Sequence, residues 1–322
     1  MRRRGDTRRR SLSSAYDRGM KIAIVGAGTV GTAIAYATAI QGVADEIALY
    51  DVNGAKATAE ILDLQHGLQF VPSVQVQGGG ELEVCRDADI VVVTAGAKQH
   101  PGQSRLDLAG TNAGITRELV PRLLELAPGA VLLFVTNPVD VVTFVAQESA
   151  AALGVEHSRI IGSGTVLDTS RLRHRLATSL SVGVSSVHAS IVGEHGDSEI
   201  ALWSTANVGG APLTMTETEL DELLHDIRHA AYRIIEGKGA TNLAIGLSTA
   251  RILAAIGNDE RAVLPISSRH SFDEVGEICL SLPTIVGRDG AVEVVDVPMN
   301  DHERAGLLAS ARAIRSAIDA AT

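Results

Sequence analysis

The 322-residue sequence lacks the features that define disulfide-rich, membrane-spanning and disordered proteins. Its two cysteines, Cys85 and Cys279, lie far apart and neither belongs to a C-x-x-C pair, so neither a disulfide framework nor a zinc site is indicated. No apolar run approaches the ~18 residues needed to cross a bilayer. Hydrophobic residues make up 45% of the chain and charged residues 20%, which is enough to fill a core and excludes global disorder. We expect a soluble cytoplasmic protein that binds no metal and no membrane.

Positive charge is scarce outside one short segment. Residues 1–19 hold seven of the 28 basic residues and two of the 38 acidic ones, so the rest of the chain carries an excess of 15 acidic side chains. An acidic body repels nucleic-acid phosphates, and no aromatic side chain lies within the arginine runs to stack on bases. No apolar segment follows the arginines as in an export signal. We expect no nucleic-acid partner, and we expect residues 1–19 to form a disordered basic extension.

Short apolar runs alternate with helical patterns from Lys21 onward. Such alternation predicts a parallel sheet with helices on both faces. The pattern predicts strands at 21–25, 46–50, 89–94 and 130–136, and helices at 29–41, 55–68 and 107–126.

The pattern changes after Gly162 and predicts a second, mixed α+β domain. The predicted helices are 165–177, 217–236 and 301–321, and the predicted strands are 187–192, 262–266, 279–282 and 291–295. The Asp289-Gly290 pair favours a hairpin between the last two strands. We therefore place a domain boundary near residue 162.

Residues 26–31, GAGTVG, form a G-x-G-x-x-G motif between the first predicted strand and helix. Gly26 permits the tight turn, Gly28 lets the backbone approach a pyrophosphate, Gly31 allows close helix–sheet contact, and the helix N-terminus supplies amide donors. Asp51 ends the next strand, where a carboxylate can bond the ribose hydroxyls and repel a 2′-phosphate. The motif predicts a Rossmann-type domain over 20–162 that binds NAD; a glycine-rich turn without a ligand is the alternative.

A second motif, residues 193–198 (GEHGDS), places His195 between two acids in a glycine-bounded turn. This position suits a general acid–base histidine, although an ordinary surface histidine is the alternative. Two further polar clusters, residues 168–173 (DTSRLR) and 98–105 (KQHPGQSR), carry arginines that would alone be solvated surface charges. Their presence beside a nucleotide motif favours a catalytic site in the second domain, residues 163–322.

Four motifs, in this order, resemble the lactate/malate dehydrogenase family over about residues 20–318. They are the glycine-rich loop, Thr136-Asn137-Pro138, Leu167-Asp168-Thr169-Ser170-Arg171, and the turn at 193–198. The resemblance implies reduction of a 2-oxo acid with NAD as the cofactor, a homotetramer, and a place in glycolysis and fermentation.

The resemblance also implies a role for each matching residue. His195 is expected to be the acid/base that gives the substrate carbonyl its proton, with Asp168 as its carboxylate partner. Arg171 is expected to grip the substrate carboxylate through two parallel hydrogen bonds, and Arg105 to polarise the carbonyl. Asn137 is expected to bond the substrate and to position the nicotinamide. The other residues expected at the cofactor are Gly26, Gly28, Val30, Gly31, Asp51, Lys56, Ala95 and Gly96.

Gln99 decides between the two substrate classes of the family. Malate dehydrogenases usually have arginine at this position to pair with a second carboxylate, whereas glutamine is neutral, which favours pyruvate and L-lactate. Thr241 matches a substrate-pocket threonine and points the same way, while the adjacent Lys98 keeps malate dehydrogenase as the alternative. A non-catalytic NAD-binding protein of this fold is a third hypothesis, and the intact charged residues argue against it.

Arg173 and His188 match positions that bind fructose 1,6-bisphosphate across a subunit interface in allosteric bacterial members of the family. Two cationic groups from each of two subunits would suit a doubly phosphorylated sugar. We expect this effector to activate the enzyme. In the alternative, Arg173 makes a surface ion pair and His188 is half-buried in its strand.

Overall fold

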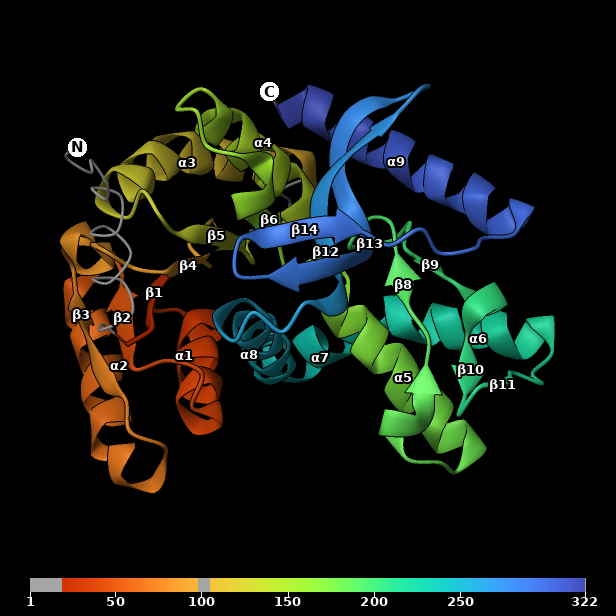
Figure 1. Ribbon diagram of the computed structural model, residues 1–322, viewed down its shortest axis with the longest axis horizontal. Helices are drawn as coiled ribbons and strands as arrows, with labels where there is room; N and C mark the ends of the chain where they lie inside the picture. The colour runs from red at the N-terminus through yellow and green to blue at the C-terminus, as the bar shows by residue number, and fades with distance from the viewer. Residues whose placement is uncertain (1–18, 98–104, 322) are drawn as a thin grey trace, which may run out of the picture.

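A nine-stranded sheet runs through the described residues, 19–97 and 105–321, of this computed structural model (Figure 1). Six of its strands are parallel and lie in the order β3-β2-β1-β4-β5-β6, which is the Rossmann order of dinucleotide-binding domains. This confirms the predicted fold class. The six strands are β1 (Lys21–Val25), β2 (Glu46–Tyr50), β3 (Gln75–Gly79), β4 (Ile90–Val93), β5 (Val131–Phe134) and β6 (Ile160–Gly162).

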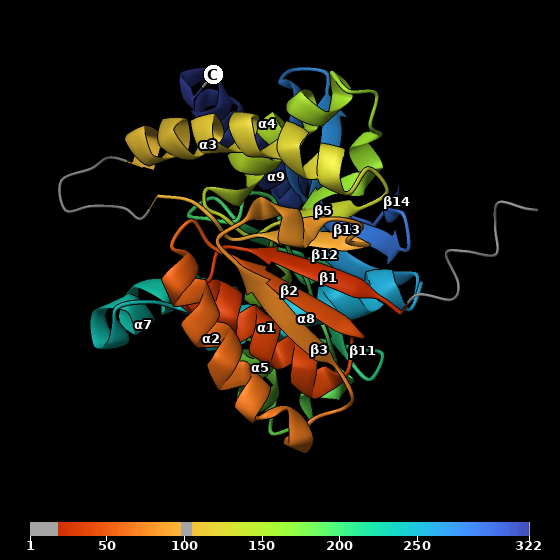
Figure 2. The same ribbon diagram turned by 90° about the vertical axis from the view of Figure 1, so that its left-hand side faces the viewer.

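Helices cover both faces of this sheet, because its central strands are apolar on both sides. In β1, Ile22 and Ile24 pack into one buried cluster, while Ala23 and Val25 pack into another on the opposite face. Figure 2 shows the two helical layers on either side of the strands. The first layer consists of α1 (Thr29–Gln41), α2 (Gly54–His66) and α8 (Leu243–Gly257), and the second of α3 (Arg105–Leu126) and α4 (Val139–Ala151).

The last three strands extend the same sheet in the antiparallel sense. They are β12 (Ala262–Phe272), β13 (Gly276–Gly287) and β14 (Gly290–Val294), and β12 joins β6 where Ser267 pairs with Gly162. The predicted hairpin is confirmed, since Gly287 pairs with Gly290. β12 is longer than predicted because its apolar run stops at Ser267, which is nevertheless fully buried. β13 begins before the predicted strand and continues past Pro283, where the apolar run ends.

The remaining elements all belong to the chain after β6. They are α5 (Val166–Leu180), β7 (Val187–His188), β8 (Ile191–Val192), β9 (Ile200–Ala201), β10 (Asn207–Val208), β11 (Ala211–Pro212), α6 (Glu217–Arg228), α7 (Ala230–Lys238) and α9 (Asp301–Ala321). Short 3-10 helices lie at Leu68–Phe70, Leu82–Cys85, His157–Arg159, Val184–Ser186 and Trp203–Thr205.

Two sequence predictions in this part are wrong. The helix predicted over 217–236 is two helices, because the backbone leaves the helical path at His229, whose ring nitrogen bonds the His225 carbonyl oxygen. The strand predicted over 187–192 is divided between two small sheets, since β7 pairs with β10 and β8 pairs with β9. Both errors follow from apolar periodicity, which continues through a change of direction that depends on tertiary contacts.

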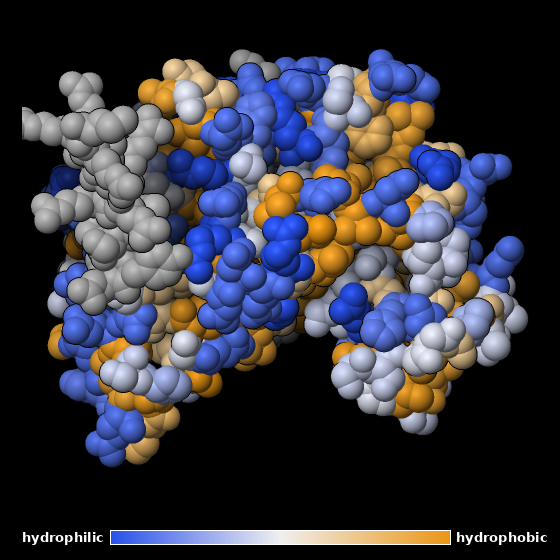
Figure 3. Space-filling model, in the orientation of Figure 1, coloured by the Kyte–Doolittle hydropathy of each residue, from blue (hydrophilic) through white to orange (hydrophobic). Residues whose placement is uncertain are grey.

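The surface seen in Figure 3 is mostly polar, with apolar side chains gathered over the region of β12 to β14. Val263, Val292 and Val294 are the exposed apolar residues of these strands. Within residues 19–97 and 105–321, no helix combines the length and the apolar character needed to span a bilayer.

Candidate active site

The predicted nucleotide loop joins β1 to α1, and its three glycines have different surroundings. A Cβ at Gly26 would lie 2.6 Å from the Thr94 Oγ1 atom, and one at Gly31 would lie 1.8 Å from the Gly26 carbonyl oxygen, so a side chain fits at neither position. At Gly28 a Cβ would meet nothing within 4 Å, and the backbone there has a φ of −76°, which any residue adopts. The protein's own packing does not require glycine at 28. The open space beside the α1 N-terminus fits a bound pyrophosphate.

Asp51 has a structural contact that the sequence did not indicate. Its Oδ2 atom accepts a hydrogen bond of 2.8 Å from the Ala27 amide, and its Oδ1 atom accepts one of 2.9 Å from the Asn53 amide. The carboxylate therefore ties the end of β2 to the glycine-rich loop. A carboxylate has about four lone-pair sites, so acceptor capacity remains for ribose hydroxyls.

The other residues predicted to contact the cofactor lie near the carboxyl ends of the parallel strands. Val30 is half-buried in α1, and Lys56 is exposed in α2. Ala95 and Gly96 follow β4, and the Ala95 carbonyl oxygen accepts a hydrogen bond of 2.8 Å from the Thr136 hydroxyl. Asn137 follows β5 and is exposed. In sheets of this type, this edge is where nucleotides bind.

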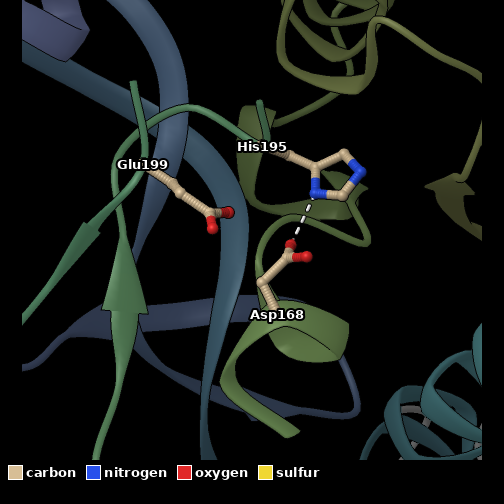
Figure 4. A group of neighbouring side chains, drawn as sticks. All are labelled: Asp168, His195 and Glu199. Atoms are coloured by element: carbon tan, nitrogen blue, oxygen red, sulfur yellow. Dashed lines mark hydrogen bonds and ion pairs between the residues drawn. The ribbon is translucent and has the colours of Figure 1, made fainter. Parts of the chain in front are cut away.

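His195 and Asp168, 27 positions apart in the chain, form the centre of the site. The His195 Nδ1 atom lies 2.6 Å from the Asp168 Oδ2 atom, with the carboxylate buried at the start of α5 (Figure 4). Burial alone would lower the pKa of His195, but the Asp168 carboxylate, with further contributions from Asp140 and Glu199, outweighs it and raises the pKa to about 9. Burial would likewise raise the pKa of Asp168, and His195 and Arg171 lower it. At neutral pH the pair is an imidazolium beside a carboxylate.

Arg171 lies one helical turn from Asp168 and shares it with His195. Its Nη1 atom is 2.5 Å from the Asp168 Oδ1 atom, so the two carboxylate oxygens hold two different cations. The pair at i and i+3 on one helix face fixes the guanidinium next to the imidazole. The arrangement offers a proton donor and an anion-binding group side by side.

Buried contacts from two other elements hold the turn that carries His195. The His195 amide donates a hydrogen bond of 2.8 Å to the Oδ2 atom of Asp140 in α4, and the Asp140 Oδ1 atom accepts one of 2.6 Å from the Ser267 hydroxyl. The Glu194 amide donates to the Ser310 hydroxyl in α9 at 2.8 Å. Burial raises the pKa of Asp140 to about 6. Sequence analysis missed this support because its residues lie in distant segments.

Glu199 is a third carboxyl group at this site that sequence analysis did not identify. It is only 2% exposed and lies between the 193–198 turn and β9. Potential ligand atoms of Asp168, His195 and Glu199 all lie within 4.8 Å of one another (Figure 4). Asp168 is already bonded to two cationic groups, which disfavours a metal ion and favours proton chemistry. A signal was present, since an acid directly precedes the apolar run that begins at Ile200.

A cavity of about 260 Å³ opens beside these groups. Asp168, Arg171 and His195 line it, and apolar side chains of α6 and α7 form its other wall. The lining also includes Leu108, Asn137, Pro138, Glu194, Glu199, Ile227, Arg228, Ala231, Tyr232 and Ile235. Its volume suits a small organic acid rather than a large substrate.

Some predicted residues lie elsewhere. Gln99 lies outside the described residues, and Arg105 is described only by its backbone, as the first residue of α3. Thr241 is half-buried between α7 and α8 and is not among the residues that line the cavity. Arg173 is half-buried and donates from Nε to the Ala189 carbonyl oxygen at 2.9 Å, next to the exposed His188. The alternative interpretation above gives Arg173 a surface ion pair, whereas in the structure its Nε atom bonds this main-chain carbonyl oxygen.

Comparison with known proteins gives the same family along the whole described chain. A family model described as the lactate/malate dehydrogenase NAD binding domain matches residues 20–162, and its alpha/beta C-terminal domain matches residues 165–322. An L-lactate dehydrogenase of Bifidobacterium animalis subsp. lactis is 46% identical over 306 residues, covering 92% of this chain and 95% of the relative. One of Synechococcus sp. is 45% identical, covering 93% and 99%.

Solved structures agree in fold. The crystal structure of a lactate dehydrogenase from a Medee basin deep-sea metagenome library matches with a TM-score of 0.89 and 38% identity, covering 94% of this chain and 99% of the other. The minor L-lactate dehydrogenase of Enterococcus mundtii matches with a TM-score of 0.87 and 42% identity, covering 93% and 98%.

Proposed function

This chain belongs to the lactate/malate dehydrogenase family, and from this premise we propose that it is an NAD-dependent L-lactate dehydrogenase that interconverts pyruvate and L-lactate. One observation carries the proposal: Asp168 holds His195 and Arg171 side by side on the wall of a small cavity. A 2-oxo acid needs these two groups, one to bind its carboxylate and one to protonate its carbonyl oxygen.

In the proposed mechanism, Arg171 binds the substrate carboxylate through two guanidinium N–H groups, and its contact with Asp168 fixes the plane of the guanidinium. His195 donates from Nε2, because its Nδ1 atom faces Asp168 (Figure 4). NADH, when bound, supplies the hydride that reduces C2. The proton moves from Nε2 to the carbonyl oxygen, and Asp168 stabilises the imidazolium before this transfer. Arg105, by the family resemblance, polarises the carbonyl as negative charge develops.

The choice of pyruvate over oxaloacetate rests on Gln99. By the family resemblance, a second substrate carboxylate would meet the neutral amide of Gln99 and would lack a charge partner, at a cost of several kcal/mol in a closed site. The pyruvate methyl group makes no such demand. The relatives of B. animalis and Synechococcus sp., which cover more than nine-tenths of this chain, carry the same activity in their names.

The finer properties that we propose are regulation, assembly and location. Fructose 1,6-bisphosphate would bind Arg173 and His188 across an interface of a homotetramer. Because Arg173 lies two residues from Arg171 on α5, a shift of this helix would couple the effector site to the substrate site. A reducing cytoplasm suits Cys85 and Cys279, which are both free and buried.

The direct test is NADH oxidation with pyruvate and, separately, with oxaloacetate. We expect a higher kcat/KM with pyruvate, and we expect His195→Ala to abolish turnover while NADH binding persists. His302→Ala removes an exposed histidine of α9 that does not line the cavity and serves as the matched control. Preference for oxaloacetate would favour malate dehydrogenase, and substantial activity in the His195→Ala variant would place the proton donor elsewhere.

A further inference from the structure

Glu199 is a buried carboxyl group that the mechanism above does not use. Its side chain is 2% exposed, and its Oε1 atom has no hydrogen-bond partner. It nevertheless lines the cavity and lies beside the Asp168–His195 pair. A buried carboxylate without a partner is costly, so the position demands an explanation beyond packing.

The charged groups that face Glu199 come from three elements. Asp168 and Arg171 belong to α5, and His195 belongs to the 193–198 turn, which directly precedes Glu199 in the chain. Arg228, at the end of α6, donates from Nη2 to the Glu199 main-chain carbonyl oxygen rather than to the carboxyl group. The carboxyl group of Glu194, the other glutamate on the cavity wall, accepts the Ser198 hydroxyl instead.

Three carboxyl groups therefore lie near the His195 imidazole: Asp168 and Asp140 both make hydrogen bonds, whereas the Oε1 atom of Glu199 has no partner. Burial, together with the negative charge of Asp168, raises the pKa of Glu199 to about 8, against the lowering effects of His195, Arg228 and Arg171. At neutral pH the group is largely neutral, which leaves Asp168 as the ionised partner of His195.

Building on the proposed function, we propose that Glu199 is a positioning residue that holds a proton while the cavity receives the substrate anion. While it is protonated, Glu199 carries no negative charge beside Arg171 and His195, the groups that bind and protonate the 2-oxo acid. Loss of that proton opposes the incoming carboxylate, so substrate binding becomes coupled to protonation at two sites, His195 and Glu199.

The pH dependence of pyruvate reduction tests this coupling. With two protons required, log(kcat/KM) for the unaltered enzyme should fall with a limiting slope near −2 at high pH, whereas Glu199→Gln, neutral at every pH, should fall with a slope near −1. At pH 7 we expect Glu199→Gln to remain within a few-fold of the unaltered enzyme. Glu222→Gln, which removes an exposed carboxylate of α6, should keep the steeper slope. Equal slopes in the enzyme and in Glu199→Gln would overturn the proposal.

A second measurement needs no variant that might fail to fold. Oxamate, an anion shaped like pyruvate that is not reduced, is titrated into the NADH-bound enzyme by calorimetry near pH 9.5 in buffers of different ionisation enthalpy. His195 alone takes up at most one proton per site, so uptake above one supports Glu199, and uptake of one or less contradicts it. Failure of the proposed function looks different, since neither pyruvate turnover nor oxamate binding would then be seen at any pH.

Discussion

Replacing Asp168 by Asn should move the pKa of His195 and with it the pH range of activity. The difference between the ordinary value of 6.5 and about 9 corresponds to about 3 kcal/mol of preference for the imidazolium. In Asp168→Asn, Asp140 and Glu199 still favour the charged ring and burial still opposes it, so we expect the pKa to fall by about two units. At pH 8 the protonated fraction would drop from about nine-tenths to about one-tenth, which lowers kcat/KM about tenfold through protonation alone.

The assay is the alkaline limb of kcat/KM for pyruvate reduction, recorded between pH 5.5 and 10. The midpoint that reports His195 should shift to lower pH by about two units in Asp168→Asn. Asp226→Asn removes one carboxylate from a largely exposed ion pair with Arg175 and should leave the limb in place. An unmoved midpoint in Asp168→Asn would show that Asp168 does not set the protonation of His195.

Thermal unfolding gives an independent check with a definite sign. Because the pKa of His195 is raised on folding, the stability that the pair contributes is fully present below about pH 6.5 and is lost as the pH rises through about 9. The Tm difference between the unaltered protein and Asp168→Asn should therefore be larger at pH 6 than at pH 9.5. A difference that grows with pH would contradict the assignment of charge.

Four further variants test other parts of the proposal. Asp51→Ser should reduce the preference for NADH over NADPH and should also raise the NADH KM, since the Ala27 amide loses its acceptor; steady-state kinetics with both cofactors measures this. Gln99→Arg should shift the kcat/KM ratio toward oxaloacetate by about tenfold or more. Arg171→Lys should raise the pyruvate KM by about tenfold or more with a smaller change in kcat, because an ammonium cannot make the two-pronged contact. Arg173→Gln combined with His188→Ala should remove any lowering of the pyruvate KM by fructose 1,6-bisphosphate while turnover at saturation survives, and superimposable saturation curves of the unaltered enzyme with and without the effector would refute that site.

The parts that the sequence predicted correctly are those that depend on neighbouring residues. The first strand, the glycine-rich loop and the first helix follow one another within residues 21–41, and the structure has the strand and helix at those bounds. The Asp289-Gly290 hairpin is equally local. In each case apolar periodicity and turn chemistry act within a few positions, so the pattern contains most of the information that determines the element.

The parts that the sequence did not predict depend on contacts between distant segments. Asp140 supports the His195 turn from 55 positions away, and it is joined to β12 through Ser267, which lies 127 positions further along. Ser267 is polar and fully buried, so a search for apolar runs ends the strand too early. Helix α8 follows the predicted boundary near residue 162, yet it packs with α1 against the first half of the sheet.

The three carboxyl groups around His195 have different pKa values because their environments differ, not because their residue types differ. Asp168 bonds two cations and has a lowered pKa, Asp140 accepts an amide and a hydroxyl and has a pKa of about 6, and Glu199 has an unpaired oxygen and a pKa of about 8. Between those last two values His195 is charged and Glu199 is largely neutral, so Glu199 adds no negative charge that would oppose an incoming anion. With a pKa of about 8 for Glu199 and about 9 for His195, we expect Glu199 to lose its proton first as the pH rises. Substrate affinity should therefore begin to weaken before the proton donor itself is lost.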